Sequence, residues 1–155
     1  RISKESFDAL SFNCYALSPD HKKMNHALEI SGLPMIIGEY HFGTVARGLA
    51  QSLWQVNSQK ERGDAFQYYT ENAFAHRGLI GTGWFRWIDQ NINGRTDGEN
   101  YNCGFIDVTD MPYPYMVDAA IEAAKSLYEI HSGTKTPFHQ APNAVGHSPI
   151  PDLWE

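Results

Sequence analysis

The spacing of hydrophobic positions along this chain changes three times from a pattern typical of β-strands to one typical of α-helices. The sequence therefore predicts three strand–helix units. Residues 9–15 alternate loosely, the run at 35–37 is continuously apolar, and residues 79–87 are aromatic and interrupted by glycine. Each of these strand-like segments is followed by residues with helical spacing. The three predicted helical faces consist of Met24, Ala27, Leu28 and Ser31; of Ala65, Phe66, Tyr69 and Ala73; and of Val117, Ala120, Ile121, Ala124, Leu127 and Tyr128.

Capping residues set the expected helix boundaries. Ser18 followed by Pro19 predicts a helix start, with Ser at the N-cap and Pro at the first helical position. Ser58 with Glu61 three residues later forms a capping box that opens the second helix. The expected helix ends lie at Gly32, Gly78 and Gly133.

Two segments and the C-terminal tail lack regular periodicity. Residues 41–57 are predicted to form a long loop with a turn of helix, and residues 89–114 a long polar loop of the kind that often carries function. Residues 134–155 hold four of the eight prolines and are expected to form an extended tail, pinned by Leu153 and Trp154. We therefore expect one α/β domain over residues 1–133.

The order of elements limits the fold further. Right-handed crossovers make the three strands parallel, either in a doubly wound sheet or in part of a barrel. No G-x-G-x-x-G or P-loop follows a strand, which argues against the common nucleotide-binding folds. Residues suited to chemistry follow each strand, which favours a (β/α)8 TIM barrel whose loops build one site. They are Tyr15, Glu39, His41, Trp87, Asp89 and Gln90.

Composition narrows the possible partners. The chain has 155 residues, 42% hydrophobic and 19% charged, as in an ordinary globular domain. A net charge of −6 argues against nucleic acid or an anionic membrane as partner, and no apolar run approaches the roughly 20 residues of a membrane span. Cys14 and Cys103 have no C-x-x-C spacing, and the seven His have no metal-binding spacing. We predict no metal and no cofactor.

Glu39 is the most informative single residue. It ends an apolar strand-like run and follows Gly38, which allows close approach of a ligand or of another backbone. The carboxyl ends of parallel strands are where chemistry occurs in α/β folds, so Glu39 is a candidate nucleophile or general base. The residues alone leave open that Glu39 is a helix-capping or salt-bridge carboxylate at a strand–loop junction.

Three motifs together resemble a known family. SFNCYA, PMIIGEYHFG and GTGWFRWIDQNINGRTDGENYNCGFIDVTDMPYP resemble the last three strand–loop units of clan A glycoside hydrolase barrels, whose catalytic carboxylates lie on the fourth and seventh strands. The long motif is similar to glycoside hydrolase family 50, the β-agarases, and more distantly to family 42 β-galactosidases. The resemblance covers about residues 8–131, and the segments at 84–90 and 97–101 carry most of its weight.

The resemblance implies a role for each matching residue. Glu39 would be the nucleophile, Tyr15 would donate a hydrogen bond that orients its carboxylate, and Trp87, ending the third strand, would stack on a sugar ring. The remaining residues implied to contact sugar hydroxyls or flank the cleft are Asn13, His41, Asp89, Gln90, Asp97, Glu99 and Asn100. The implied partner is agarose or a galactan oligosaccharide.

The chain departs from the family in one respect. Retaining hydrolysis needs a second carboxyl group about 5–5.5 Å from the first. In this clan it follows an Asn on the fourth strand, and the sequence contains no Asn-Glu pair. Since a complete barrel takes about 250 residues, and since residues 1–5 show neither an initiator Met nor a signal segment, we expect the C-terminal three units of an incomplete barrel.

That expectation carries consequences for activity and location. The acid/base would lie upstream, the chain alone would be inactive, and the intact enzyme would be secreted or periplasmic. A non-catalytic carbohydrate-binding fragment and a β-galactosidase of a related clan A family are the alternatives. The sequence does not indicate the oligomeric state, or whether cleavage is endo or exo.

Overall fold

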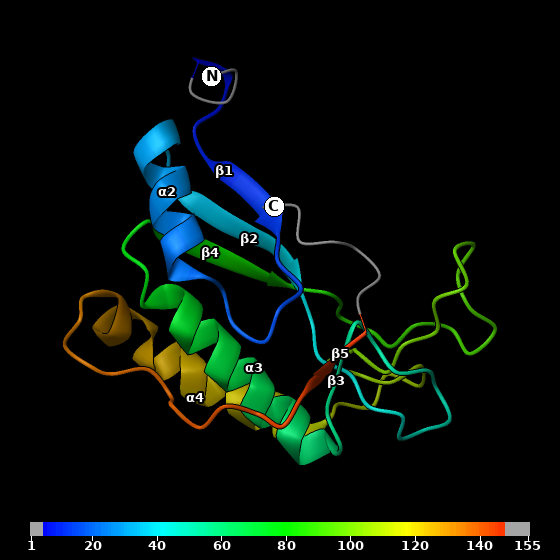
Figure 1. Cartoon of the computed structure of the whole chain (residues 1–155). Coiled ribbons are helices and arrows are strands. Elements are labelled where there is room, and N and C mark those ends of the chain that lie inside the picture. The colour runs from blue at the N-terminus through cyan, green and yellow to red at the C-terminus, as the bar shows by residue number, and fades with distance from the viewer. Residues whose placement is uncertain (1–4, 148–155) are drawn as a thin grey trace.

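The three predicted strands lie side by side in one parallel sheet. The computed structural model describes residues 5–147 of the chain. Its sheet has the order β1-β2-β4, and both strand pairs are parallel (Figure 1). The elements of this core are β1 (Leu10–Asn13), α2 (His21–Ser31), β2 (Met35–Tyr40), α3 (Gln59–Phe74), β4 (Leu79–Trp84) and α4 (Pro114–His131). The predicted α/β class with parallel strands is confirmed.

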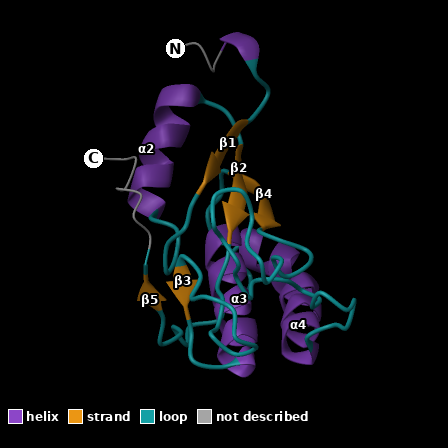
Figure 2. Ribbon diagram, turned by 90° about the vertical axis from the view of Figure 1, so that its right-hand side faces the viewer, coloured by secondary structure: helices purple, strands orange, loops and turns teal. Residues whose placement is uncertain are grey.

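Helices α3 and α4 pack against each other beside the sheet, as Figures 1 and 2 both show. Gly63 on α3 permits this contact, because a Cβ at that position would collide with the backbone carbonyl oxygen of Tyr115 on α4. Helix α3 lies between β2 and β4 in the chain and forms the crossover that makes these two strands parallel. No helix in the described part of the chain is long and apolar enough to cross a membrane.

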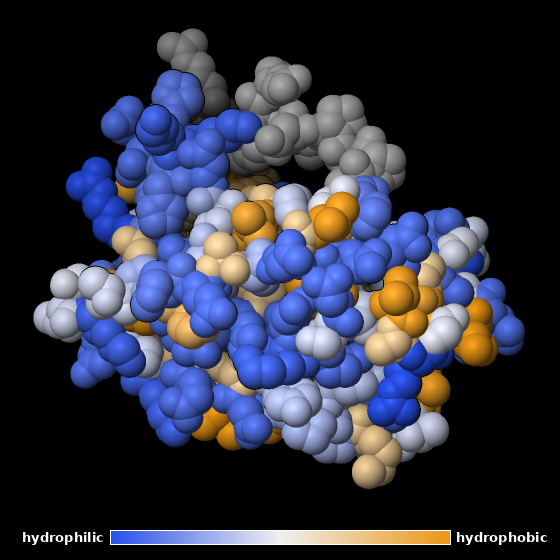
Figure 3. Space-filling view, turned by 60° about the horizontal axis from the view of Figure 1, so that its bottom comes forward, coloured by the Kyte–Doolittle hydropathy of each residue, from blue (hydrophilic) through white to orange (hydrophobic). Residues whose placement is uncertain are grey.

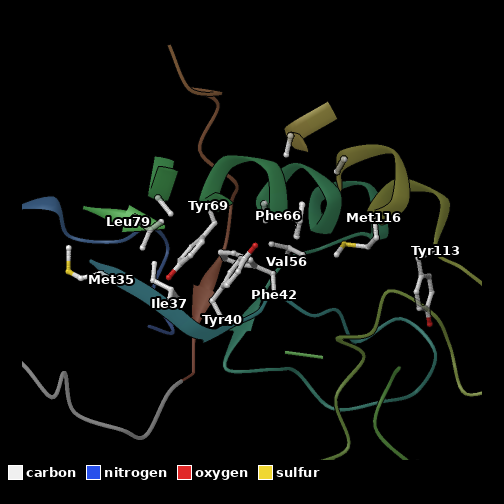
Figure 4. Close-up of a cluster of buried hydrophobic side chains, with 14 of the residues drawn as sticks. Met35, Ile37, Tyr40, Phe42, Val56, Phe66, Tyr69, Leu79, Tyr113 and Met116 are labelled. Carbon is white, nitrogen blue, oxygen red and sulfur yellow. The ribbon is translucent and has the colours of Figure 1, made fainter. Parts of the chain in front are cut away.

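The core lies between β2 and α3. Met35, Ile37 and Tyr40 of β2 point to the helices and are buried, and the ring of Tyr40 stacks on that of Tyr69 with 4.0 Å between centroids (Figure 4). The predicted buried face of α3, which includes Tyr69, is confirmed. These stacked rings bury a large apolar area between the sheet and α3.

The first helix starts later than its sequence suggested. Helix α2 begins at His21 and its N-cap is Asp20, so the start predicted at Ser18 and Pro19 is wrong. The Asp20 carboxylate accepts from the amides of Lys22 at 2.8 Å and Lys23 at 3.3 Å. An ionised carboxylate satisfies two free amides at a helix start, which gives Asp20 the advantage over an uncharged Ser.

The predicted cap of α3 is confirmed with one change. The Ser58 hydroxyl accepts from the amide of Glu61 at 3.1 Å, as a capping box requires. The Glu61 carboxylate reaches back to the amide of Asn57 at 2.9 Å, one residue before the N-cap. Both ends of the first turn are therefore tied to side chains.

Helix α4 buries a different face from the one predicted. Val117, Ile121 and Tyr128 of the predicted stripe are exposed. The buried residues are Met116, Ala119, Ala123, Ser126 and Ile130. Two adjacent stripes of this helix are apolar or small, and the close approach at Gly63 selects the one with the smaller side chains. On the face drawn in Figure 3, exposed hydrophobic side chains are interspersed with hydrophilic ones.

Residues from two of the irregular segments form a second, smaller sheet. Residues 41–57 contain the strand β3 (Trp54–Gln55), which pairs antiparallel with β5 (Val145–Gly146) from the tail. The helical turn predicted between residues 41 and 57 is therefore wrong. Leu153 and Trp154, which were expected to pin the tail, lie outside the described residues.

Candidate functional site

The carboxyl ends of the three parallel strands meet at one edge of the sheet. Asn13, the last residue of β1, lies opposite Glu39 on β2, and Tyr40 lies opposite Trp84, the last residue of β4. The loops that leave these strands lie at the same end of the molecule (Figure 1). Strand β4 ends three residues before Trp87, so the prediction that Trp87 ends a strand is wrong. It belongs to the loop that follows.

Glu39 and Tyr15 form the centre of this edge. The Tyr15 phenol donates a hydrogen bond of 2.7 Å to Oε2 of Glu39, which is half-buried. Burial raises the pKa of Tyr15 far above its usual range, and the neighbouring Glu39 carboxylate raises it further. The phenol therefore stays protonated and acts as the donor. Gly38 lets β1 approach, since a Cβ there would lie 2.9 Å from Oδ1 of Asn13.

His41 lies behind Tyr15 rather than beside open solvent. Only 1% of its surface is exposed, and both ring nitrogens have partners in the protein. Nε2 accepts from the amide of Leu53 at 3.1 Å, so Nδ1 carries the proton that is donated to the carbonyl of Phe85, also at 3.1 Å. Burial lowers the pKa of His41 to about 3, which keeps the ring neutral. A sugar hydroxyl could bond either nitrogen only by displacing one of these partners.

Trp87 is the large aromatic residue left open at this edge. The residue is 68% exposed, and its ring stacks on that of Phe105, with 5.9 Å between centroids and 21° between planes. The backbone carbonyl of Trp87 accepts from the amides of Phe105 at 2.8 Å and Ile106 at 3.1 Å. The loop thus packs against one face of the indole, while most of the surface of Trp87 faces solvent.

Asp89 and Gln90 point into the protein. Oδ1 of Asp89 accepts from the amide of Gly104 at 2.7 Å, and Oδ2 accepts from the Tyr113 phenol at 2.6 Å. The Gln90 side chain accepts from the amide of Tyr101 at 2.6 Å and donates to Glu99 at 2.8 Å. Both side chains are buried and bond protein groups that fold the loop.

The acidic tip of the same loop is more open. Glu99 is half-buried and also pairs with Arg95 at 3.4 Å, while the exposed Asp97 pairs with Arg95 at 2.8 Å. Asn100 donates to the carbonyl of Ile92 at 3.4 Å. The negative charge of Glu99 also contributes to the raised pKa of Tyr15. Such a cluster can accept hydrogen bonds from hydroxyl groups.

Sequence reasoning missed Arg62 and Asn102, which organise the loops. Both are fully buried, and Arg62 donates to the carbonyls of Asn102 at 2.8 Å and Gly104 at 2.9 Å. The available signal was a charge on the buried face of α3, since Arg62 precedes Ala65 by three residues and Phe66 by four. For Asn102 the sequence carries no comparable signal.

Among the described residues, no group of three or more His, Cys, Asp or Glu side chains is placed to hold a metal ion. Neither Cys14 nor Cys103 forms a disulfide. Burial raises the pKa of the Cys103 thiol to about 12, so this thiol is protonated and unreactive. The groups available for chemistry at this edge are therefore carboxylates, phenols and amides.

A carboxylate bonded by a phenol at the carboxyl edge of a parallel α/β sheet, with an exposed indole beyond it, fits the class of glycoside hydrolases. Comparison with curated proteins agrees. The chain is 39% identical over 129 residues to β-agarase A and 36% identical over 123 residues to β-agarase B, both from Vibrio sp. (strain JT0107). These matches cover 82% and 78% of the chain.

Solved structures give the same result. An exo-β-agarase superimposes on 84% of the chain with a TM-score of 0.79 and 36% identity. The chain is β-agarase-like, and its resemblance to glycoside hydrolase family 50 is confirmed. It spans 12% and 13% of the length of the two curated relatives and 18% of the solved chain. Models of known protein families give no match.

Proposed function

We propose that Glu39 is the nucleophile of a retaining glycoside hydrolase of the β-agarase type, which cleaves β-galactosidic linkages of agarose or its oligosaccharides. The observation that carries this proposal is the 2.7 Å hydrogen bond from the Tyr15 phenol to the Glu39 carboxylate at the carboxyl edge of the sheet. A fixed donor on one oxygen orients the carboxylate and leaves the other oxygen to attack. The similarity to β-agarases A and B supports the substrate class.

The reaction proceeds in two displacements. A Glu39 oxygen attacks the anomeric carbon while the bond from that carbon to the leaving oxygen breaks, and a second carboxylic acid gives its proton to the leaving oxygen. Water then attacks the same carbon, releases Glu39, and returns a proton to the second carboxylate. Tyr15 stays protonated throughout, since burial and the adjacent carboxylate both oppose its ionisation.

The surrounding residues divide into two groups. Trp87 offers an exposed ring for stacking on an apolar sugar face, and its support by Phe105 keeps that ring in place. The open polar residues suited to bonding sugar hydroxyls are Asn13, Asp97, Glu99 and Asn100. We assign His41, Asp89 and Gln90 to the walls of the cleft, because their polar atoms already bond protein groups.

The second carboxylate belongs to another part of a longer protein in this proposal. Residues 1–133 would form the last three units of a (β/α)8 barrel, with the Pro-rich residues 134–155 extending from it. The parallel strand order and the small share of the relatives' length that the chain spans support this arrangement. The chain alone would then bind sugar without cleaving it. Because agarose is an extracellular polymer, the whole enzyme would be secreted or periplasmic.

The nucleophile is tested by Glu39→Ala in the full-length enzyme that carries this chain, assayed on agaro-oligosaccharides. We expect kcat to fall by roughly a thousandfold or more, with partial recovery in azide, which can replace the missing carboxylate at the anomeric carbon. Glu29→Ala on the exposed face of α2 is the matched control and keeps full activity. Unchanged activity, or loss without azide rescue, would remove Glu39 from this role.

The missing carboxylate is tested with the 155-residue chain itself. Titration with agaro-oligosaccharides is expected to show binding without turnover. Hydrolysis by this chain would contradict the placement of the acid/base elsewhere. If the full-length protein also binds without turnover, the non-catalytic carbohydrate-binding alternative is correct, and a preference for simple β-galactosides would favour a β-galactosidase.

A further inference from the structure

The buried side chain of Asn102 has all of its hydrogen-bonding capacity in use. Oδ1 accepts from the Thr44 hydroxyl at 2.8 Å and from the Gln59 amide at 2.6 Å. Nδ2 donates to Oδ2 of Asp89 at 2.8 Å and to the Tyr113 phenol oxygen at 2.9 Å. Two acceptors and two donors on opposite sides fix the orientation of the amide. Few other side chains offer this pattern in the same volume.

The four partners come from four different segments of the chain. Thr44 lies in the loop that follows β2, the strand of Glu39, and Asp89 lies in the loop that follows β4 and carries Trp87. Gln59 belongs to the first turn of α3, and Tyr113 is the N-cap of α4. Asn102 therefore joins the loops on both sides of the proposed cleft to the rigid helices beneath them.

The backbone around Asn102 is held as firmly as its side chain. Arg62 donates to the carbonyls of Asn102 and Gly104, and its guanidinium lies 4.3 Å from the centroid of the Tyr113 ring. Asp89 accepts from the amide of Gly104 at 2.7 Å and lies 4.0 Å from Arg62. The buried Arg62 guanidinium and the buried Asp89 carboxylate thus both form hydrogen bonds with the backbone of residues 102–104, and these bonds restrict the conformation of the segment.

Neighbours of Asn102 in sequence reach the proposed site in two directions. The ring of Tyr101 packs edge-on against His41 with 5.7 Å between centroids, and His41 packs against Tyr15 at 4.9 Å. Tyr15 in turn bonds Glu39. Three residues after Asn102, the ring of Phe105 lies beneath Trp87. Residues 101–105 therefore connect the support of the Glu39–Tyr15 pair with the support of the exposed indole.

We propose that Asn102 is a positioning residue, which sets the placement of the Trp87 loop relative to the Glu39–Tyr15 pair and so controls sugar binding without touching the sugar. This inference rests on the proposed function, in which Trp87 and the loop acids bind the substrate. The competing explanation is that Asn102 contributes only to the stability of the fold. The two explanations predict different kinetics.

The test compares Asn102→Asp with Asn72→Asp in the full-length enzyme. Each substitution removes an amide that makes two donated bonds, but Asn72 bonds the carbonyls of Tyr68 and Phe138 and ties α3 to the tail. With agaro-oligosaccharide as substrate, we expect Asn102→Asp to raise KM by about tenfold and to change kcat by less than about threefold. Asn72→Asp keeps KM within about twofold.

A milder variant guards against failure to fold. Thr44→Val keeps the side-chain volume but removes one bond to Asn102, and we expect a rise of about threefold in KM. An unchanged KM in folded Thr44→Val and Asn102→Asp, or an equal rise in Asn72→Asp at the same loss of Tm, would reduce Asn102 to a stabilising residue.

A readout without substrate separates this inference from the proposed function. Arg47 and Arg95 are exposed trypsin sites in the two loops that Asn102 joins. Asn102→Asp is expected to increase cleavage at both sites severalfold, with no increase in Asn72→Asp. If the wild-type enzyme has no activity on agaro-oligosaccharides, the proposed function fails while this cleavage still tests the anchoring of the loops. Unchanged cleavage in Asn102→Asp would overturn the inference itself.

Discussion

The imidazole of His41 lies edge-on against the ring of Tyr15, with 4.9 Å between the ring centroids. The Tyr15 ring, whose phenol donates to Glu39, therefore packs against a buried imidazole. This imidazole can carry a charge but is neutral here. Two internal hydrogen bonds fix the tautomer of His41, and burial opposes its protonation. A neutral ring at this position leaves Tyr15 as the polar donor that faces the carboxylate.

Stability should fall in acid because of His41. Its pKa is about 3 in the folded protein against the ordinary value of 6.5. Below pH 6.5 the unfolded chain binds a proton that the folded protein does not, so the free energy of unfolding decreases as pH falls toward 3. The slope from this residue approaches about 1.4 kcal/mol per pH unit. Urea unfolding between pH 7.5 and pH 4 measures it.

Two variants check the assignment of that slope. His41→Gln is expected to make the pH dependence shallower, whereas His26→Gln on the exposed side of α2 leaves it unchanged. Some slope remains in His41→Gln, because burial also lowers the pKa of His76. A slope identical to that of the wild type in His41→Gln would show that folding does not lower the pKa of His41.

Removal of the Tyr15 hydroxyl should affect the chemical step. In Tyr15→Phe the Glu39 carboxylate loses the donor that orients it, and we expect kcat on agaro-oligosaccharides to fall by roughly 10- to 100-fold with little change in KM. Tyr128→Phe is the control, since Tyr128 is 90% exposed on α4. Steady-state kinetics of the full-length enzyme distinguish the two, and a change confined to KM would contradict an orienting role.

Loss of the exposed indole should affect binding instead. Trp87→Ala removes the ring that rests on Phe105, and we expect KM to rise by about tenfold, equivalent to about 1.4 kcal/mol. Ile92→Ala removes an exposed apolar side chain from the same loop and serves as the control. Equal effects of the two substitutions would indicate general disturbance of the loop rather than stacking on sugar.

Two glycines of β4 should differ in their tolerance of a methyl group. A Cβ at Gly83 would collide with the carbonyl oxygen of Gly38 on β2, whereas a Cβ at Gly81 would meet Ile36 at an ordinary 3.7 Å. We expect Gly83→Ala to lower the free energy of unfolding by about 2–4 kcal/mol and Gly81→Ala by less than about 1 kcal/mol. Denaturant unfolding compares them, and similar losses would mean that β2 and β4 can separate without cost.

The sequence predicted most of the helices and strands, but not all of their boundaries or of the faces that they bury. Three strands, their parallel order and the buried face of α3 followed from apolar periodicity and from the right-handed crossover rule. The buried face of α4 did not, because Val117 and Met116 are equally apolar and only the approach of α3 decides which is covered. The start of α2 was missed because Ser18 and Asp20 are both good caps.

The candidate site shows the same division. Tyr15 and Glu39 were proposed because both lie near the carboxyl ends of predicted parallel strands, and the family resemblance implied the hydrogen bond that the structure shows between them. The inward direction of Asp89 and Gln90 could not be read from sequence, since an acid or amide in a loop can face solvent or the core. Contacts over 13 or more residues, such as those of Asp89 with Asn102 and Tyr113, have no local signature.

The sequence by itself determined the three strands of the main sheet, their parallel direction and the place of Glu39 at the end of the second, because periodicity and strand-end position are local properties. The bond from Tyr15 to Glu39 was implied by the family resemblance and is made by two segments 24 residues apart. Only the tertiary structure decided that His41 is buried and neutral and that Asn102 joins two loops to two helices. Burial and hydrogen bonding depend on which distant segments meet. The packing of the whole domain, rather than any one stretch of chain, determines which of these segments come into contact.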